Sequence, residues 1–180
     1  MDETILYTQR LYNGRIINLD LLEVRLPDGN HSKREVITHP GAAAIVAVDA
    51  DGKILLVRQF RIAAGKVLRE IPAGTLNPDE PPARCAEREL QEETGYKPGQ
   101  LDELTGFFPA PGYTTEFIHV YLATQLVESR LKADSDEFIE VDRVTLPEAI
   151  DMIARGDIVD GKTIIGLMLA ARRLDVQGAK

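Results

Sequence analysis

Two apolar runs joined by a four-residue turn constrain the fold of this chain most strongly. Residues 42–49 (AAAIVAVD) and 54–60 (ILLVRQF) are separated by Ala50-Asp51-Gly52-Lys53. Short apolar runs bounded by turn residues predict buried strands, and the short connection predicts a hairpin. A sheet that contains such strands needs further elements packed over it, which favours helices on its faces.

The forty residues before this hairpin predict strands and no helix. Residues 4–12 and 15–25 alternate loosely around Asn13-Gly14, a strong hairpin signal, and residues 33–38 follow a second turn at 27–30. Three strands cannot bury two faces alone, so this layer must cover the rest of the chain or a second copy of the protein. We expect a β-layer over residues 1–40 that takes part in dimerisation, and a domain over residues 41–180.

The remainder of the chain alternates strands and helices. The predicted strands are 67–71, 101–108, 117–126 and 138–145, and the predicted helices are 83–94, 147–154 and 162–174. This order predicts an α+β protein in which helices flank a mixed sheet as an α/β/α sandwich, with an added N-terminal antiparallel layer.

Composition excludes several classes of function. The 180 residues carry 29 acidic and 21 basic side chains, and a net charge of −8 disfavours binding to nucleic-acid phosphates. No apolar run is long enough to span a bilayer, and the acidic, polar first residues do not resemble a secretory signal. The single cysteine, Cys85, fits a reducing compartment. We therefore expect a cytoplasmic protein with neither nucleic acid nor membrane as a partner.

The segment 74–96 (GTLNPDEPPARCAERELQEETGY) carries the most chemistry. On the predicted helix, Glu89, Glu92 and Glu93 stand at i, i+3 and i+4 and form an acidic face. Like charges at this spacing cost roughly a few tenths of a kcal/mol per pair, and anions are disfavoured near a helix C-terminus. A hard divalent cation such as Mg²⁺ would remove this conflict, whereas a solvated acidic face is the alternative.

The spacing within this segment resembles the Nudix box. Gly74, five residues, Glu80, seven residues and then Arg88-Glu89-Leu90-Gln91-Glu92-Glu93-Thr94-Gly95-Tyr96 match the family pattern, except that Tyr96 replaces a bulky aliphatic residue. The resemblance implies a Nudix fold and divalent-metal chemistry with Mg²⁺, or alternatively Mn²⁺. It also implies a role for each matched position: metal ligands at Glu89, Glu92, Glu93 and the main-chain carbonyl of Ala73, a salt bridge from Arg88 that orients a glutamate, a brace for the loop from Glu80, and turns permitted by Gly74 and Gly95.

Outside the box, the chain resembles the ADP-ribose pyrophosphatase branch of this family over nearly its whole length. The similar segments include KREVITHPGAAAIVAVD and FFPAPGYTTEFIHVYLA, while RQFR and GDIVDGKT are shared with the GDP-mannose hydrolase branch. The resemblance implies substrate contacts from Arg61 and Glu116. Arginine suits a bidentate grip on phosphate and an aromatic ring can stack on a base, so the remaining candidates are Arg58, Arg34 and Tyr113. A solvated strand end for Arg58, a plain surface position for Glu116 and a core position for Tyr113 are the alternatives.

A second acidic cluster, residues 134–142, contains no basic side chain. Taken alone, such a cluster is most often a solvated loop. Beside a metal site, one of its carboxylates could take the proton of an attacking water once the loop closes. The resemblance assigns this role of general base to Glu137, with Asp136 as the alternative.

These expectations together predict a divalent-metal-dependent enzyme that hydrolyses the diphosphate bond of a nucleoside diphosphate sugar. ADP-ribose, cleaved to AMP and ribose 5-phosphate, is the expected substrate, and GDP-mannose is the alternative. A non-catalytic nucleotide sensor of the same fold would typically lack box carboxylates that this chain keeps. The resemblance further implies a homodimer in which the N-terminal layer exchanges between subunits.

Overall fold

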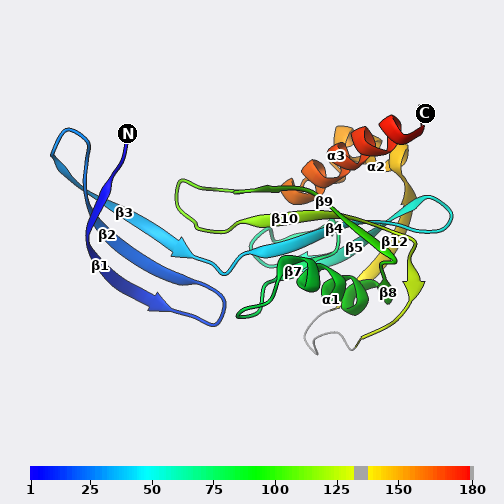
Figure 1. The fold of residues 1–180 in the computed structure, drawn as a ribbon, viewed down its shortest axis with the longest axis horizontal. Helices are drawn as coiled ribbons and strands as arrows, with labels where there is room; N and C mark the ends of the chain where they lie inside the picture. The colour runs from blue at the N-terminus through cyan, green and yellow to red at the C-terminus, as the bar shows by residue number, and fades with distance from the viewer. Residues whose placement is uncertain (132–137, 179–180) are drawn as a thin grey trace. The chain divides into compact units, whose positions relative to one another are not determined.

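The structure, a computed structural model, describes residues 1–131 and 138–178 and forms two compact units (Figure 1). The smaller unit contains Met1–Gly41 together with Phe108–Phe117, and the larger unit contains Ala42–Phe107 and the chain from Ile118 onward. The segment 108–117 groups with the N-terminal strands because its backbone is bonded to them. Ile37 N donates to Tyr113 O at 2.7 Å, and Thr115 N donates to Ile37 O at 2.9 Å.

The smaller unit is a three-stranded antiparallel sheet in the order β1 (Thr4–Asn13), β2 (Asn18–Arg25), β3 (His31–Thr38). The predicted antiparallel layer is therefore confirmed. Asp20 on β2 is buried and accepts hydrogen bonds from Arg10 and from Thr38 Oγ1, which ties the three strands together. The side chains of β1 are exposed, including several large apolar ones.

A mixed seven-stranded sheet forms the centre of the larger unit. The path of the sheet is β12-β5-β4-β10-β9, with β6 paired to β5 and β7 paired to β4. Only β4 and β10 pair in parallel among these strands, and the other pairs are antiparallel. The strands are β4 (Ala42–Val48), β5 (Lys53–Arg61), β6 (Lys66–Glu70), β7 (Ala73–Thr75), β9 (Gln100–Phe107), β10 (Ile118–Thr124) and β12 (Glu140–Thr145).

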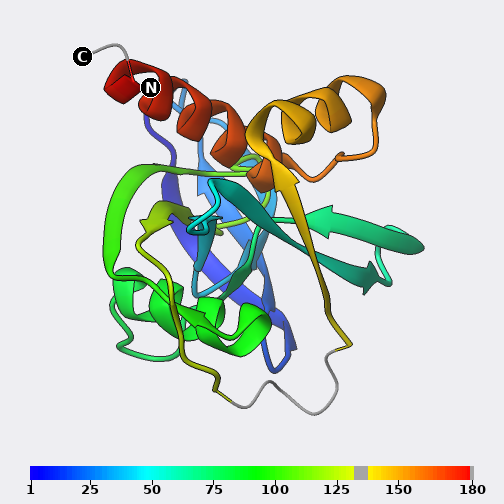
Figure 2. The same ribbon diagram turned by 90° about the vertical axis from the view of Figure 1, so that its right-hand side faces the viewer.

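Helices cover both faces of this sheet, as Figures 1 and 2 show. α1 (Pro82–Thr94) lies on one face, and α2 (Leu146–Arg155) and α3 (Gly161–Gly178) lie on the other. The strand alternation supplies two cores: Ile45 and Leu55 pack towards Leu90 of α1, whereas Val46, Ile54 and Leu56 pack towards Leu167 of α3. The predicted α/β/α sandwich is confirmed, because the apolar runs of β4 and β5 are buried on both sides.

Local signals determine where the central helix begins and ends. Pro82 occupies the first turn of α1, where its missing N–H costs nothing. Gly95 ends the helix in the left-handed conformation with φ 80°, and its N–H donates to Gln91 O at 3.1 Å. The predicted helix and its glycine cap are thus correct. No helix among the described residues is both long and apolar enough to cross a membrane.

Three short strands were not predicted: β7, β8 (Tyr96–Lys97) and β11 (Val127–Glu128). Two or three residues are too few to show a two-residue periodicity in sequence. β7 nevertheless matters most for the site, because it runs along β4 and leads directly into the loop before α1.

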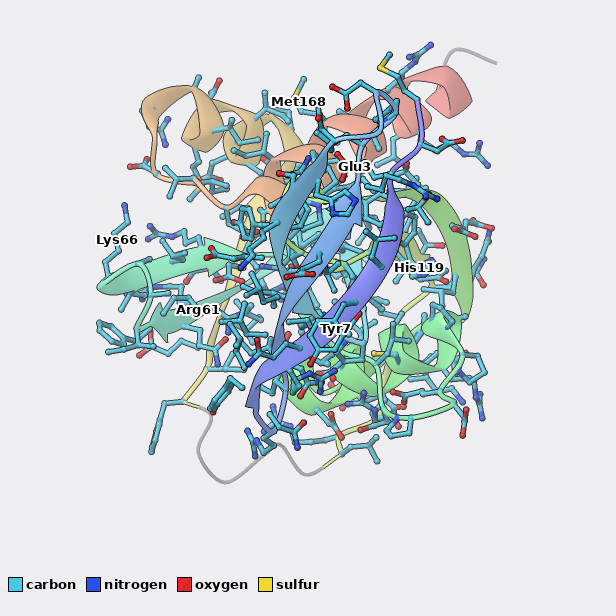
Figure 3. All side chains as sticks on the ribbon, turned by 90° about the vertical axis from the view of Figure 1, so that its left-hand side faces the viewer. Glu3, Tyr7, Arg61, Lys66, His119 and Met168 are labelled. Atoms are coloured by element: carbon cyan, nitrogen blue, oxygen red, sulfur yellow. The ribbon has the colours of Figure 1, made fainter. Side chains whose placement is uncertain are left out.

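The packing of α3 predicts that substitutions at two neighbouring residues change the free energy of unfolding by different amounts. Leu167 is fully buried, whereas Met168 is 52% exposed (labelled in Figure 3). Leu167→Ala should lower the free energy of unfolding by about 2–5 kcal/mol, because it leaves a cavity against the sheet. Met168→Ala should change it by about 0.5 kcal/mol or less. Urea denaturation of both variants measures this, and equal losses would contradict the placement of α3.

Candidate active site

The acidic face of α1 is directed largely into the protein. Glu89 and Glu93 are buried to 9% and 7% exposure, on the same helix as the buried Cys85, Ala86 and Leu90. Glu92, between them, is half-buried. A plain solvated face, the alternative raised by the sequence, does not describe Glu89 and Glu93. Buried carboxylates of this kind need a compensating charge.

Arg88 supplies part of that charge by binding three carboxylates at once. Its Nε and Nη2 donate to the two oxygens of Glu80 at 2.8 and 2.9 Å. Its Nη1 donates to Glu89 Oε1 at 2.5 Å and to Glu92 Oε2 at 2.9 Å. The sequence predicted a salt bridge from Arg88 to one glutamate, whereas the structure shows pairs with three. One arginine can do this because its planar guanidinium carries five N–H donors.

The loop before the helix is held by Glu80. In addition to its bidentate pairing with Arg88, Glu80 Oε2 accepts a hydrogen bond from Asn77 N at 2.9 Å. The bonds from Arg88, opposed in part by burial, lower the pKa of Glu80 from 4.5 to about 2. Glu80 therefore stays ionised and braces the loop, as the sequence led us to expect.

Glu93 connects the helix to the start of β7. Its Oε2 accepts a hydrogen bond from Ala73 N at 3.0 Å. Ala73, whose carbonyl the sequence singled out as a metal ligand, thus lies beside a predicted carboxylate ligand. Ala73 contacts Glu93 through its N–H. Its carbonyl oxygen is a different atom, and it is the one that the sequence predicts as a metal ligand.

Position 74 requires a glycine because the Glu89 side chain lies too close for any Cβ atom, and not because the backbone needs an unusual φ. It does not adopt a left-handed φ, unlike Gly95. A Cβ atom at position 74 would lie 1.9 Å from Cδ and from Oε1 of Glu89. The expectation that Gly74 permits a turn is therefore replaced by a steric one: a side chain here would displace the Glu89 carboxylate.

Cys85 is a packed thiol next to the cluster. Its Sγ lies 3.6 Å from the carbonyl oxygens of Gly74 and Thr75. Burial, together with the nearby Glu89, raises the pKa of the thiol to about 12. A thiol that stays protonated is a poor nucleophile, so Cys85 serves packing and not catalysis.

The donor set of this cluster suits a divalent cation. Arg88 binds Glu80, Glu89 and Glu92, and Glu93 lies on the same helix face, so the four carboxylates and one guanidinium carry a formal charge of −3. Within the part of the chain that the structure describes, no group of three or more carboxylate, histidine or cysteine side chains is already arranged to hold a metal ion. Hard carboxylate oxygens with excess negative charge are what Mg²⁺ and similar ions bind.

Two predicted substrate-binding arginines lie at the end of β5 in the same unit. Arg58 Nη1 donates to Glu140 Oε2 of β12 at 2.8 Å. Arg61 donates through Nε and Nη2 to both oxygens of Glu70, at 2.7 and 2.8 Å (Arg61 is labelled in Figure 3). The bonds to Glu70, opposed by burial and aided by the charge of Glu93, raise the pKa of Arg61. Arg61 therefore lies within electrostatic reach of the carboxylate cluster.

Three of the remaining predicted residues come from the other compact unit. Arg34, Tyr113 and Glu116 belong to the smaller unit, where Arg34 pairs with Glu3 at 2.5 Å and Tyr113 is exposed. Glu116 lies 4.0 Å from His39 Nδ1. The two candidates for the general base, Glu137 and Asp136, lie outside the described residues.

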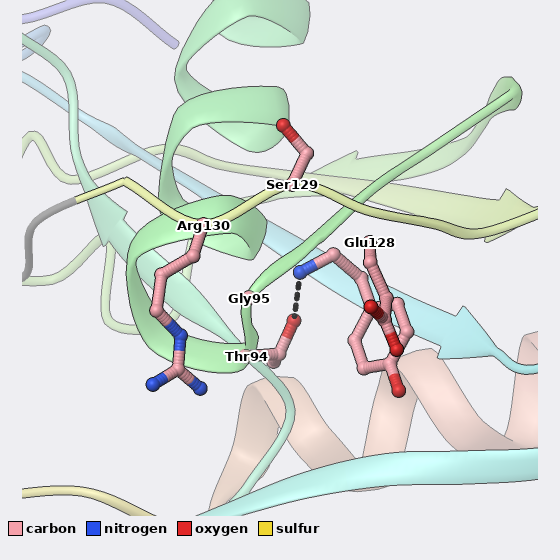
Figure 4. A pocket seen from close by; sticks show the side chains of 6 residues that line it. Thr94, Gly95, Glu128, Ser129 and Arg130 are labelled. Carbon is pink, nitrogen blue, oxygen red and sulfur yellow. Dashed lines mark hydrogen bonds between the residues drawn. The ribbon is translucent and has the colours of Figure 1, made fainter.

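A pocket of about 420 Å³ lies at the C-terminal end of α1 (Figure 4). It is lined by Thr94, Gly95, Tyr96, Glu128, Ser129 and Arg130. None of the predicted site residues lines it, so it is distinct from the carboxylate cluster.

Sequence reasoning assigned no role to a second group of charged residues, Glu70, Asp160 and Lys162. Glu70 is almost fully buried and receives Lys162 Nζ as well as Arg61. The segment GDIVDGKT was noted as a resemblance, and it contains both Asp160 and Lys162. The position of Glu70 directly before Ile71, within the predicted strand 67–71, was the signal that could have directed attention to it.

Comparison with known proteins identifies the family. The NUDIX domain model matches residues 38–165, which include the carboxylate cluster and the sheet around it. This protein belongs to the Nudix family. Enzymes of this family generally need a divalent metal ion.

Relatives match over most of their length. An ADP-ribose pyrophosphatase of Bacillus subtilis is 38% identical over 100% of this chain and 98% of its own. A methanol dehydrogenase activator of Bacillus methanolicus is 40% identical over 92% and 91%, and a GDP-mannose pyrophosphatase of Escherichia coli is 38% identical over 74% of each chain. A crystal structure of an ADP compounds hydrolase shares the fold, with a TM-score of 0.88 at 22% identity over 99% and 97%.

The close approach at Gly74 predicts a defect in metal binding. Gly74→Ala should move the Glu89 carboxylate and weaken Mn²⁺ binding about 10-fold or more, because small displacements around a ligand reduce metal affinity strongly. Titration with Mn²⁺, followed by electron paramagnetic resonance, measures the affinity. Gly161→Ala is the control, since a methyl group there meets nothing within 4 Å. Equal affinities in both variants would show that Glu89 is not a ligand.

The lowered pKa of Glu80 predicts a pH-dependent contribution to stability in metal-free protein. The folded pKa of about 2 lies below the ordinary 4.5, so the ionised group stabilises the fold above about pH 4.5. This contribution disappears as the pH falls from 4.5 towards 2. The stability difference between wild type and Glu80→Gln should therefore be large at pH 6 and shrink below pH 4.5.

Urea denaturation in EDTA at several pH values measures this difference. Glu87→Gln is the control, because Glu87 forms an i,i+3 pair with the exposed Arg84 on the same helix, and such pairs contribute little stability. A difference for Glu80→Gln that stays constant from pH 6 to pH 2.5 would refute the assignment.

Proposed function

We propose that this protein hydrolyses the diphosphate bond of nucleoside diphosphate sugars, and that ADP-ribose is its main substrate. The products would be AMP and ribose 5-phosphate. The observation that carries the proposal is the cluster on α1, in which Arg88 gathers Glu80, Glu89 and Glu92 beside the buried Glu93. The cluster lies in a chain of the Nudix family that keeps every charged position of the box.

The metal ligands in this proposal are Glu89, Glu92 and Glu93 with the carbonyl of Ala73. Mg²⁺ is the proposed ion, with Mn²⁺ as a substitute. A bound divalent cation polarises phosphoryl oxygens and lowers the pKa of a coordinated water. The chain supplies the arrangement: Glu80 holds Arg88, Arg88 holds Glu89 and Glu92, and the N–H of Ala73 holds Glu93.

Glu137 is the proposed general base, with Asp136 as the alternative, and Glu92 and Arg88 complete the catalytic group. A carboxylate suits the removal of a proton from the attacking water. Arg61 is proposed to bind the diphosphate, since Nε and Nη2 face Glu70 and its other donors remain for an anion. Glu116 is a further proposed substrate contact, supported by the family resemblance. Arg58, Arg34 and Tyr113 are proposed because arginine can grip phosphate and an aromatic ring can stack on a base.

The choice of substrate is supported by relatives. The Bacillus subtilis relative, which covers the whole chain, is an ADP-ribose pyrophosphatase, whereas the GDP-mannose pyrophosphatase covers 74%. Release of AMP or GMP should be measured on ADP-ribose, GDP-mannose, ADP-glucose, NADH and diadenosine polyphosphates. A higher kcat/KM for GDP-mannose than for ADP-ribose would select the alternative substrate.

Charge removal at Glu93 tests the catalytic assignment. Glu93→Gln keeps an oxygen for the N–H of Ala73, so the fold should persist while turnover falls about 100-fold or more, equal to about 2.7 kcal/mol. Glu87→Gln, on the same helix, should keep the wild-type rate. Near wild-type turnover of Glu93→Gln at saturating Mg²⁺ would contradict its role as a ligand. Binding of ADP-ribose by the wild type without AMP release would favour the non-catalytic sensor.

We also propose that the protein is a cytoplasmic homodimer. The lone buried Cys85 suits a reducing compartment, and β1 exposes Ile5, Leu6, Tyr7, Leu11 and Tyr12. Burial of these side chains by a second copy would remove apolar surface from water.

Light scattering at micromolar concentration should give about twice the 19.9 kDa chain mass. Tyr7→Glu, which places a charge in the proposed interface, should shift the protein towards monomer. A wild-type monomer would refute the dimer.

A further inference from the structure

A buried ion-pair network lies next to the carboxylate cluster. Glu70, the last residue of β6, is 1% exposed. Each of its oxygens is occupied: Oε1 accepts from Arg61 Nε, and Oε2 accepts from Arg61 Nη2 and from Lys162 Nζ. Glu70 therefore joins the β5–β6 hairpin, which Figure 2 shows projecting from the sheet, to the beginning of α3.

The first turn of α3 holds Lys162 in place. Lys162 Nζ also pairs with Asp160 at 3.1 Å, and Asp160 caps the helix by accepting from Thr163 N at 3.0 Å and from Thr163 Oγ1 at 2.6 Å. Thr163 Oγ1 in turn accepts from Ile71 N at 2.9 Å, in a fully buried contact. Two residues further on, Ala73 N donates to Glu93. The network thus reaches the start of β7, where the carbonyl of Ala73 is one of the proposed metal ligands.

The charges within the network balance. Glu70 and Asp160 carry two negative charges, and Arg61 and Lys162 carry two positive ones. Burial alone would raise the pKa of Glu70, but Arg61 and Lys162 outweigh burial and lower it. Buried ion pairs contribute little net stability compared with apolar packing, so their value is more often in geometry.

Arg61 is held by only one edge of its guanidinium. Nε and Nη2 face Glu70, and Nη1 has no hydrogen-bond partner among residues 1–131 and 138–178. The side chain is 38% exposed. An arginine whose orientation is set by a buried carboxylate can present its remaining donors to a phosphate without first losing rotamer freedom.

We propose that Lys162 is a positioning residue for substrate binding, which acts through Glu70 to fix the guanidinium of Arg61 towards the diphosphate. The inference rests on the proposed function and deepens it, because it assigns a role to the C-terminal segment around Lys162. Loss of Lys162 leaves the group with a net charge of −1 and leaves Arg61 as the only counter-charge of Glu70. With that donor lost, the Glu70 carboxylate can turn, so the guanidinium of Arg61 is no longer fixed towards the diphosphate.

Affinity for ADP-ribose without metal, and steady-state kinetics with Mg²⁺, test the proposal together. The affinity is measured by calorimetry in EDTA, so it does not depend on turnover. Lys162→Met should weaken binding and raise KM about 10-fold, with kcat within about 3-fold of wild type. Lys162→Arg should restore most of the affinity because it keeps the charge. Lys97→Met, at an exposed position of β8, is the control and should change neither quantity.

A double-mutant cycle separates positioning from direct contact. If Lys162 acts through Arg61, Lys162→Met should weaken binding by less than about 2-fold when added to Arg61→Met. Full additivity of the two substitutions would mean that Lys162 binds substrate itself and would overturn the proposal. An unchanged affinity in Lys162→Met, or a lowered melting temperature with unchanged affinity, would assign it a structural role and would also overturn it.

These outcomes are distinguishable from failure of the proposed function. AMP release by wild type with unchanged ADP-ribose affinity in Lys162→Met would leave the hydrolase standing and remove the positioning role. ADP-ribose binding that depends on Lys162, without any AMP release, would support the positioning role and remove the proposed hydrolase activity. No binding of ADP-ribose by wild type would overturn both.

Discussion

The arrangement of the site depends on one arginine that holds carboxylates together in a mostly buried place. Glu80, Glu89 and Glu92 would repel one another at this distance, and Glu93 adds a fourth negative charge nearby. The positive charge of Arg88 offsets part of this repulsion. Because its five N–H donors are fixed in one plane, the hydrogen bonds from Arg88 also set the positions of the three carboxylates. The excess negative charge that remains is what makes the cluster suitable for a cation.

The surrounding fold serves this cluster. β7 runs close to α1 because Gly74 has no side chain, and Glu89 occupies the space that a Cβ atom would need. The helix begins at a proline and ends at a left-handed glycine, so the three glutamates fall within its last two turns. Buried residues of β4 and β5 pack against the helix, so the site is attached to regular, well-packed elements of the unit.

A second charged network, around Glu70, also uses ion pairs to fix the positions of side chains, and it includes residues near the C-terminal end of the chain. It joins the β5–β6 hairpin, the start of α3 and Ile71, two residues before Ala73, through buried and part-buried hydrogen bonds. The two networks meet electrostatically at Arg61 and Glu93. Elements that are up to about ninety residues apart in sequence, such as Glu70 and Lys162, thus act on one small region.

The amino-acid sequence by itself determined the elements whose signals are local or strictly spaced. The helix of the Nudix box, its proline start and its glycine end, the apolar strands β4 and β5 and the N-terminal antiparallel layer all follow from periodicity, turn residues and motif spacing. The family followed from the spacing of the box. Each of these signals is contained within a few tens of residues.

Only the tertiary structure decided which charged groups meet. That Arg88 binds three carboxylates, that Glu89 and Glu93 are buried, and that Gly74 is needed for contact with Glu89 could not be derived from spacing along one helix. The same holds for Glu70 with Arg61 and Lys162, and for the grouping of residues 108–117 with the N-terminal strands. The physical reason is that hydrogen bonds and ion pairs act over a few ångströms in space, and chain folding sets those distances independently of separation in sequence.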